Sequence, residues 1–129
     1  FFVVNGDLLT NLDFEKMLNF HHEHNSKATM CISEYNIESP YGEVKLEQEN
    51  IILIDEKPIH KFFVNAGIYI LDPKSLKLTP KKFYDMPSLF KKIIANKLKT
   101  ISFPLGEYWI DIGSFNDYKK AKIEYDTKF

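Results

Sequence analysis

The sequence predicts an α/β domain that contains a mixed β-sheet with flanking helices and one antiparallel strand pair. Residues 1–4 are apolar and are followed by Asn5-Gly6, a pattern typical of a fully buried, central strand that ends in a tight turn. An amphipathic segment and a second apolar run come next, in the order of a βαβ unit with a right-handed crossover. Residues 41–47 then alternate between polar and apolar side chains, as a strand exposed on one face does.

The first helix is expected after Asn11 or Asp13, because either side chain can cap a helix amino terminus. Its apolar stripe recurs at helical spacing and consists of Phe14, Met17, Leu18 and His21. Residues 21–24 of this helix include three histidines. Zinc requires three or four convergent ligands and only His21 and His24 share a face, so we expect a solvated helix end rather than a metal site.

The middle of the chain predicts three strands. Residues 27–33 form an internal strand with Cys31 in the core, and the polar residues 35–40 are expected to form a loop. Residues 51–54 return antiparallel to residues 41–47.

Residues 62–71 are the longest apolar run, which is interrupted by Asn65 and Gly67. A glycine inside such a strand indicates either close approach of a ligand or another chain to the backbone, or a β-bulge. Both interpretations remain open at this point.

The last part of the chain predicts two helices and two strands. Pro87 suits the first position of a helix whose apolar residues are Leu89, Phe90, Ile93 and Ile94. Residues 100–105 predict a strand, and residues 108–113 predict a short strand that ends in a carboxylate and a glycine. Residues 114–117 resemble a capping box that opens the last helix. In that helix we expect three inward-facing residues, Phe115, Tyr118 and Ala121, and three exposed lysines, Lys119, Lys120 and Lys122.

The composition argues against several classes of protein. The chain has 129 residues, of which 44% are hydrophobic and 27% charged, as in one ordinary globular domain. A net charge of −1 and the absence of arginine argue against a nucleic-acid surface. With Cys31 as the single cysteine an intrachain disulfide is impossible, and no apolar run has the length of a membrane span. We therefore expect a soluble, cytoplasmic protein that binds neither nucleic acid nor a membrane.

Two carboxylates lie at the ends of predicted strands. Asp7 comes directly after the first strand, at the position where open α/β sheets bind ligands. Asp111 ends a second strand, so the sheet can bring the two together despite their distance in sequence. Mg²⁺ is typically held by one or two carboxylates, with phosphate oxygens and water completing its octahedron. The alternative is that Asn5-Gly6 is only a turn.

Four segments, in this order, resemble the sugar-1-phosphate nucleotidyltransferases, which make nucleotide sugars. They are VVNGD at residues 3–7, YGEV at 41–44, EKP at 56–58 followed by VNAGIYIL at 64–71, and YWIDIGSFNDY at 108–118. The resemblance spans nearly the whole chain and is closest to guanylyl-, thymidylyl- and cytidylyl-type enzymes that act on hexose or amino-sugar 1-phosphates. It implies an incomplete Rossmann-like mixed sheet and a role in nucleotide-sugar synthesis, for example for cell-surface polysaccharide.

The resemblance also implies a role for each matching position. Asp7 and Asp111 match the two aspartates that bind the catalytic Mg²⁺. Glu56 matches a glutamate that contacts sugar hydroxyls, and Lys57 a lysine that contacts the sugar phosphate. Four further positions match residues around the sugar, namely Tyr41, Gly42, Asn65 and Gly67. For Glu56 and Lys57 the alternative is a solvated turn.

The reaction that the resemblance implies joins a sugar 1-phosphate to a nucleoside triphosphate. A sugar phosphate oxygen attacks the α-phosphorus in line and pyrophosphate leaves, without a covalent enzyme intermediate. The protein contributes positioning and charge neutralisation, for which Asp7, Lys57 and Asp111 are the candidate catalytic residues.

The family's Gly-rich nucleotide loop, which contains arginine and lysine, has no counterpart in this sequence. We therefore expect residues 1–129 to be the carboxyl-terminal portion of one nucleotidyltransferase domain, without its amino-terminal nucleotide-binding segment and inactive alone. The missing strands would leave an exposed edge at residues 3–4, which predicts a homo-oligomer. The alternative function is a non-catalytic sugar-phosphate-binding or assembly module on the same scaffold.

Overall fold

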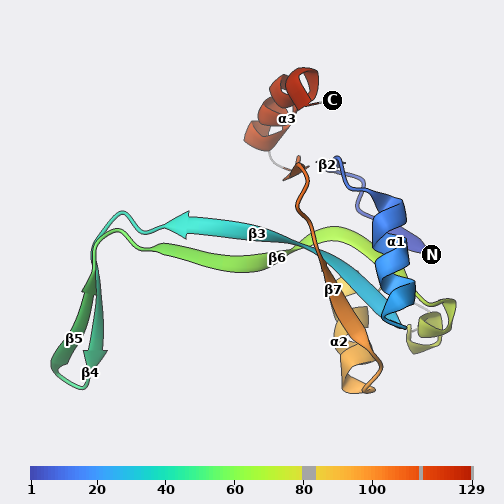
Figure 1. Ribbon diagram of the computed structural model, residues 1–129, viewed down its shortest axis with the longest axis horizontal. Coiled ribbons are helices and arrows are strands. Elements are labelled where there is room, and N and C mark those ends of the chain that lie inside the picture. Colours follow the sequence, from blue (N-terminus) through green and yellow to red (C-terminus); the bar gives the residue numbers. More distant parts are fainter. Residues whose placement is uncertain (80–83, 114, 129) are drawn as a thin grey trace. The chain divides into compact units, whose positions relative to one another are not determined.

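The computed structural model describes residues 1–79, 84–113 and 115–128, without the side chains of residues 115–117, 121 and 128 (Figure 1). The chain forms two compact units. The first contains residues 1–33 and 65–129, and the second contains residues 34–64. Each unit is described by itself.

A four-stranded sheet forms the centre of the first unit, with the strand order β1-β6-β3-β7. The strands are β1 (Phe2–Val4), β3 (Ala28–Glu38), β6 (Ile59–Leu71) and β7 (Thr100–Pro104). β1 pairs antiparallel with β6, whereas β3 pairs parallel with β7, so the sheet is mixed. The predicted α/β class with a mixed sheet is confirmed.

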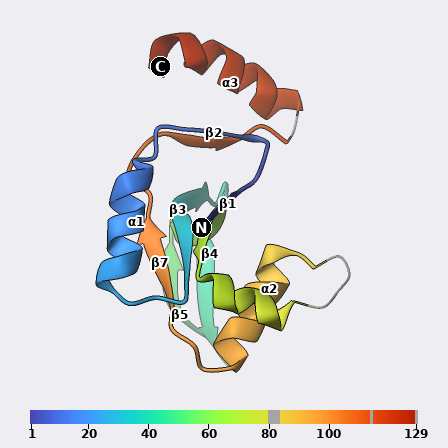
Figure 2. The ribbon, with the colours of Figure 1, turned by 90° about the vertical axis from the view of Figure 1, so that its right-hand side faces the viewer.

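Two helices cover the sheet on opposite faces. Consecutive side chains of β6 point in opposite directions, so the strand contributes to the core on both faces. Ile68 and Ile70 belong to one core cluster with Met17 of α1 (Phe14–Glu23). Tyr69 belongs to the other cluster, with Leu89 of α2 (Met86–Ala95). Figure 2 shows the two helices on either side of the strands. Burial on both faces explains why residues 68–71 of β6 are consecutively apolar.

The first strand differs from its prediction. β1 lies at an edge of the sheet, and Val4 is 46% exposed, so the prediction of a fully buried, central strand is wrong. Strand, helix and strand follow in the predicted chain order, but β6 lies between β1 and β3. An apolar sequence indicates that a strand is buried by packing, but it does not indicate whether the strand lies at the edge or in the centre of the sheet.

A second, two-stranded sheet pairs β2 (Leu8–Thr10) antiparallel with β8 (Trp109–Asp111). β8 was predicted and β2 was not. The predicted last helix is α3 (Phe115–Lys128), and its three lysines are exposed as expected. Tyr118 is 52% exposed, so its predicted inward orientation is wrong. The expectations for Phe115, Ala121 and the capping box lie outside the described residues and side chains.

The predicted cap of α1 is confirmed, and α2 has a cap of the same kind that was not predicted, with Pro87 at its second residue. The Asp13 side chain accepts a hydrogen bond from the Lys16 N–H at the start of α1. Asp85 does the same for the Ser88 N–H in α2, and Pro87 lies in the first turn. A short 3₁₀ helix, η1 (Pro73–Leu78), follows β6. Caps of this kind satisfy backbone donors that have no partner within the helix.

The predicted solvated helix end is confirmed for residues 22–24, which are exposed, and wrong for His21. Its side chain is buried, and Nδ1 lies 2.6 Å from the Thr29 hydroxyl of β3. Burial is the main cause that lowers the pKa of His21, and the neighbouring His22 lowers it further. The position of His21 in the apolar stripe of α1 decides its burial, and Thr29 supplies the polar partner that a buried ring nitrogen needs.

Cys31 is buried in β3 as predicted, and burial raises the pKa of its thiol to about 11. A thiol with so high a pKa is a poor nucleophile, in agreement with a role in the core. β3 continues to Glu38, so the loop predicted at residues 35–40 is wrong for most of its length. Polar and apolar residues alternate over this stretch, which is the pattern of an exposed strand.

The second unit contains the predicted antiparallel pair, which consists of β4 (Glu43–Glu47) and β5 (Asn50–Asp55). Val44 pairs with Ile54 and Lys45 with Leu53, and the register shifts after Lys45. Apolar residues of both strands are at least half exposed. In the part of the chain that the structure describes, no helix is long and apolar enough to cross a membrane.

Candidate functional site

The β2–β8 pair brings Asp7 and Asp111 together in the first unit. Leu8 is paired with Asp111 across the two strands, so Asp7 lies one residue before the paired segment. The Asp7 carbonyl accepts a hydrogen bond of 2.8 Å from the Ile112 N–H, one residue beyond β8. The convergence predicted for these two aspartates is therefore present, and a strand that the sequence did not reveal produces it.

Both carboxylates lie against the backbone of Gly113. A Cβ atom built at Gly113 would lie 3.0 Å from Asp111 Oδ1 and 3.2 Å from Asp7 Oδ2. The Gly113 N–H also donates to Asp111 Oδ1 at 2.8 Å. A side chain at this position would crowd the two oxygens, so glycine keeps the space beside both carboxylates open.

The carboxylate pair is all that this site offers a metal ion in the part of the chain that the structure describes. Among those residues no group of three or more His, Cys, Asp or Glu side chains is placed to hold an ion. Two carboxylates suit a hard cation that takes its other oxygens from water and substrate phosphates, as Mg²⁺ does. They do not suit structural zinc, which requires a closed set of four ligands.

Gly67 has a structural reason for being glycine. Its φ angle is +77°, a left-handed conformation that is costly for other residues. A Cβ atom there would lie 2.6 Å from Asn5 Nδ2 and 3.2 Å from Leu8 Cδ1. The atoms closest to Gly67 belong to Asn5 and Leu8 of this same chain, and approach by a ligand or another chain stays a prediction.

Asn65 uses both ends of its side-chain amide within the first unit. Oδ1 accepts from the Gly67 N–H and Nδ2 donates to the Tyr69 hydroxyl, each at 2.8 Å. Tyr69 is buried, and burial raises the pKa of its phenol. Asn65 thus contacts Gly67, and the Gly67 carbonyl accepts a hydrogen bond from the Asn5 N–H, two residues before Asp7.

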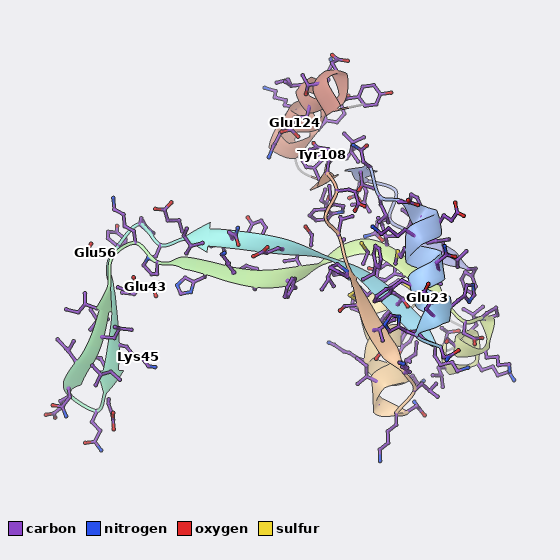
Figure 3. All side chains as sticks on the ribbon, viewed as in Figure 1. Glu23, Glu43, Lys45, Glu56, Tyr108 and Glu124 are labelled. Carbon is purple, nitrogen blue, oxygen red and sulfur yellow. The ribbon has the colours of Figure 1, made fainter. Side chains whose placement is uncertain are left out.

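Trp109 and Tyr108 connect β8 to other parts of the unit. Trp109 Nε1 donates to the Ala66 carbonyl at 2.8 Å. The Tyr108 hydroxyl donates to the Glu124 carboxylate of α3 (Figure 3). Burial first, and this hydrogen bond second, raise the pKa of Tyr108 to about 12. The phenol thus remains protonated and keeps its donor at neutral pH.

A groove of about 330 Å³ lies between the β2–β8 pair and α3. Its lining residues are Leu8, Leu9, Ile112, Tyr118, Lys122, Tyr125 and Asp126. Leu8 follows Asp7 and Ile112 follows Asp111, so the groove shares backbone with the carboxylate site.

The other predicted site residues lie in the second unit. Tyr41 is 77% exposed, and the Glu56 carboxylate lies near Gly42, where a Cβ atom would be 3.6 Å from Oε1. Lys57 follows with a φ angle of +48°. The Ser39 N–H donates to the Pro58 carbonyl at 2.9 Å, which closes this segment. Within their unit these residues are close together in one pair of loops beside the β4–β5 hairpin.

Sequence reasoning missed three residues that hold the carboxylate site, namely Ala66, Tyr69 and Trp109. Trp109 is the only tryptophan of the chain and stands two residues before Asp111, which is a signal that the sequence did contain. The contact between its indole and a backbone carbonyl leaves no sequence pattern, because any residue carries such a carbonyl.

Comparison with known proteins gives a consistent result. The family profile described as nucleotidyl transferase matches residues 1–128. Mannose-1-phosphate guanyltransferase of Kluyveromyces lactis is 30% identical over 97% of this chain and 36% of its own length. A probable mannose-1-phosphate guanylyltransferase of Oryza sativa is 34% identical over 92% of this chain and 34% of its own. The chain thus spans about a third of the length of these relatives.

Among solved structures, HddC from Yersinia pseudotuberculosis is 26% identical, with a TM-score of 0.64. The match covers 97% of this chain and 55% of that protein. HddC has also been solved in complex with GMP-PN, with the same similarity. On the family match, which extends over nearly all of its residues, this chain belongs to the nucleotidyl transferase family.

Proposed function

We propose that this chain is part of a sugar-1-phosphate nucleotidyltransferase and holds the catalytic Mg²⁺ between Asp7 and Asp111. The observation that supports the proposal is the convergence of both carboxylates on the backbone of Gly113. Two negative side chains gathered at one glycine repel each other unless a cation lies near them. A purely structural turn has no need of such a pair.

The donor set fits Mg²⁺ in kind and in number. The site offers two carboxylates and an open space that a Cβ atom at Gly113 would fill. Asp7 and Asp111 would hold the Mg²⁺ ion, which would supply neutralisation of the negative charge on the substrate phosphates. The chain's own contribution is to fix the two carboxylates through the β2–β8 register and the Ile112–Asp7 hydrogen bond.

The proposed reaction is transfer of a nucleotidyl group to a sugar 1-phosphate. An oxygen of the sugar phosphate attacks the α-phosphorus of a nucleoside triphosphate, and the bond to the pyrophosphate leaving group breaks. Lys57 would offset repulsion between the two anionic substrates, and Glu56 would accept hydrogen bonds from sugar hydroxyls. Tyr41 and Gly42 would lie beside the sugar. These roles require positioning and charge and no covalent intermediate.

The substrate class follows from the relatives. Two of those compared above are named for guanylyl transfer to mannose 1-phosphate, and HddC was solved with GMP-PN. We therefore place GTP and hexose 1-phosphates first among the candidate substrates. Because the chain spans only 36% of the Kluyveromyces lactis relative, the proposal concerns the activity of the longer protein that contains it. We propose that the isolated chain, as the carboxyl-terminal portion of the domain, is inactive.

The test is pyrophosphate release by the full-length protein with a panel of nucleoside triphosphates and sugar 1-phosphates, with and without Mg²⁺. Asp7→Asn and Asp111→Asn remove one charge each and keep the size of the side chain. We expect turnover to fall by two or more orders of magnitude in both variants, as it does when a positioned charge is lost. Lys57→Ala should raise the KM for the sugar phosphate.

Asp13→Asn is the matched control, because it also replaces an aspartate by an amide in the same unit. Asparagine caps a helix as well as aspartate does, so α1 keeps its cap. Turnover that does not depend on Mg²⁺, or that survives both Asp7→Asn and Asp111→Asn, would contradict the proposal. Binding of a sugar phosphate without turnover in a folded protein would favour the non-catalytic binding module.

A further inference from the structure

We infer that Ala66 and Gly67 of β6 form a shared anchor that positions both carboxylate-bearing segments, and that Asn65 and Tyr69 brace this anchor. The inference rests on the proposed function, because it explains how the proposed metal ligands are held. It makes Asn65, Gly67, Tyr69 and Trp109 positioning residues. None of them needs to touch the metal or the substrate.

The first arm of the anchor holds the segment that leads to Asp7. The Asn5 N–H donates to the Gly67 carbonyl at 2.9 Å, two residues before Asp7. The Asn5 side chain also lies against the Gly67 Cα, where no Cβ atom fits. Both contacts fix the turn from which the Asp7 carboxylate projects.

The second arm holds the segment that leads to Asp111. The Trp109 indole N–H donates to the Ala66 carbonyl at 2.8 Å, two residues before Asp111. The two arms therefore begin at adjacent carbonyls of one strand. They also meet at their far ends, where the Ile112 N–H donates to the Asp7 carbonyl. The result is a closed loop of contacts around the two carboxylates.

The brace keeps the anchor in its unusual conformation. Gly67 has a φ angle of +77°, and its N–H donates to Asn65 Oδ1. Asn65 Nδ2 donates in turn to the Tyr69 hydroxyl. The Tyr69 ring is buried against Phe90 of α2, with ring centroids 5.5 Å apart. The brace thus connects the anchor to the hydrophobic cluster beneath α2.

The role of Asn65 follows from this geometry. Each end of its amide already has a partner within the chain, and both partners belong to the brace. A residue in this arrangement sets the shape of the backbone, so we assign it a positioning role in addition to the sugar-lining role that the resemblance implies. Metal ligands held by such outer contacts lose affinity when those contacts are removed.

The experiment uses the full-length protein and two measurements. Mn²⁺ affinity is measured by electron paramagnetic resonance, and amide hydrogen exchange is measured by mass spectrometry for peptides that cover residues 108–113. Trp109→Phe removes the indole donor and keeps an aromatic ring, and Tyr69→Phe removes only the hydroxyl. Tyr84→Phe is the matched control, because its hydroxyl donates to the Ser88 carbonyl of α2, in the same unit.

We expect Mn²⁺ affinity to fall about tenfold in Trp109→Phe and about threefold in Tyr69→Phe, without change in Tyr84→Phe. Exchange in the 108–113 peptides should become faster in the first two variants only. If Trp109→Phe fails to fold, Tyr69→Phe still carries the test. Wild-type exchange and Mn²⁺ affinity in both variants would overturn the inference.

The proposed function fails in a different way. In that case wild-type protein would bind Mn²⁺ no better than the double variant Asp7→Asn/Asp111→Asn. Hydrogen exchange would then still decide whether the anchor holds the two segments, because that measurement needs no metal. Unchanged exchange in Trp109→Phe and Tyr69→Phe would overturn the anchor in that case too.

Discussion

Replacing Gly67 by alanine perturbs the one glycine whose backbone and surroundings both exclude a side chain. Its φ angle of +77° lies in the left-handed region, and the added methyl would lie 2.6 Å from Asn5 Nδ2. Asn5 is exposed, so its side chain can rotate away, whereas the backbone strain remains. Leu8 Cδ1, at 3.2 Å, must also shift.

The size of the effect can be estimated from these contacts. A left-handed conformation costs an alanine roughly 1–2 kcal/mol. Displacing Asn5 and Leu8 adds to this cost, and the smaller entropy of an unfolded chain with alanine offsets about 0.4–1 kcal/mol. We therefore expect Gly67→Ala to lower the free energy of unfolding by about 1–2 kcal/mol. With an ordinary urea dependence, the midpoint falls by roughly 0.5–1 M.

The assay is urea unfolding followed by the fluorescence of Trp109, the single tryptophan of the chain. Gly106→Ala is the matched control, because no heavy atom would lie within 4 Å of its added Cβ and its φ angle is not left-handed. This control should leave stability unchanged or raise it slightly. Equal midpoints for Gly67→Ala and Gly106→Ala would refute the reasoning. Adding Asn5→Ala separates the two causes, since it relieves the contact and leaves the φ strain.

Three further predictions concern the first unit. Because burial lowers the pKa of His21 below its ordinary 6.5, the unfolded chain takes up this proton first on acidification. The contribution of His21 to stability is therefore constant above about pH 6.5 and is lost as the pH falls toward the pKa of the folded state. If the urea midpoint falls as much on acidification in His21→Gln as in the wild type, this prediction is wrong. Asp13→Ala should destabilise the protein by about 1 kcal/mol in the same urea assay while Asp13→Asn should not, and equal losses would exclude the cap. Val4→Pro should abolish association through the edge of β1 in sedimentation velocity and leave the fold intact, and an unchanged oligomer would place the contact elsewhere.

The geometry of β1 explains the choice of Val4. The Phe1 and Leu71 backbones exchange both hydrogen bonds, and the Asn5 N–H donates to Gly67. Since donors alternate along an antiparallel strand, the Val4 N–H faces away from β6. Proline at this position removes a donor from the free edge and none from the ladder. Val3→Pro is the contrasting variant, because it removes a ladder bond and should destabilise the fold.

Some of the elements that could be predicted from sequence have a period long enough to read. The ten residues of α1 show their apolar face clearly, and the β4–β5 hairpin shows strict alternation at its start. β6 was predicted from the length of its apolar run. β2 has three residues, which is too short for any period, and it exists only because β8 pairs with it. β1 and β8 are equally short and were predicted, so length alone does not explain why β2 was missed.

Other misses arise from partners far along the chain. The edge position of β1 depends on β6 inserting between β1 and β3, which nothing in the first strand encodes. The candidate site contains residues that the sequence could predict and contacts that it could not. Asp7 and Asp111 could be selected by their residue type and their place after strands, whereas the Trp109 contact with Ala66 depends on a backbone atom.

The register of the β2–β8 pair links the fold to the candidate chemistry. Leu8 pairs with Asp111 and Thr10 with Trp109, and this register alone brings Asp7 alongside Ile112. A slip of one residue would turn every side chain of one strand to the other face and separate the carboxylates. A pair of three-residue strands has little register preference of its own. The contact of Trp109 with Ala66 and that of the Thr10 hydroxyl with the Tyr108 carbonyl, at 2.6 Å, therefore set the register from outside the ladder.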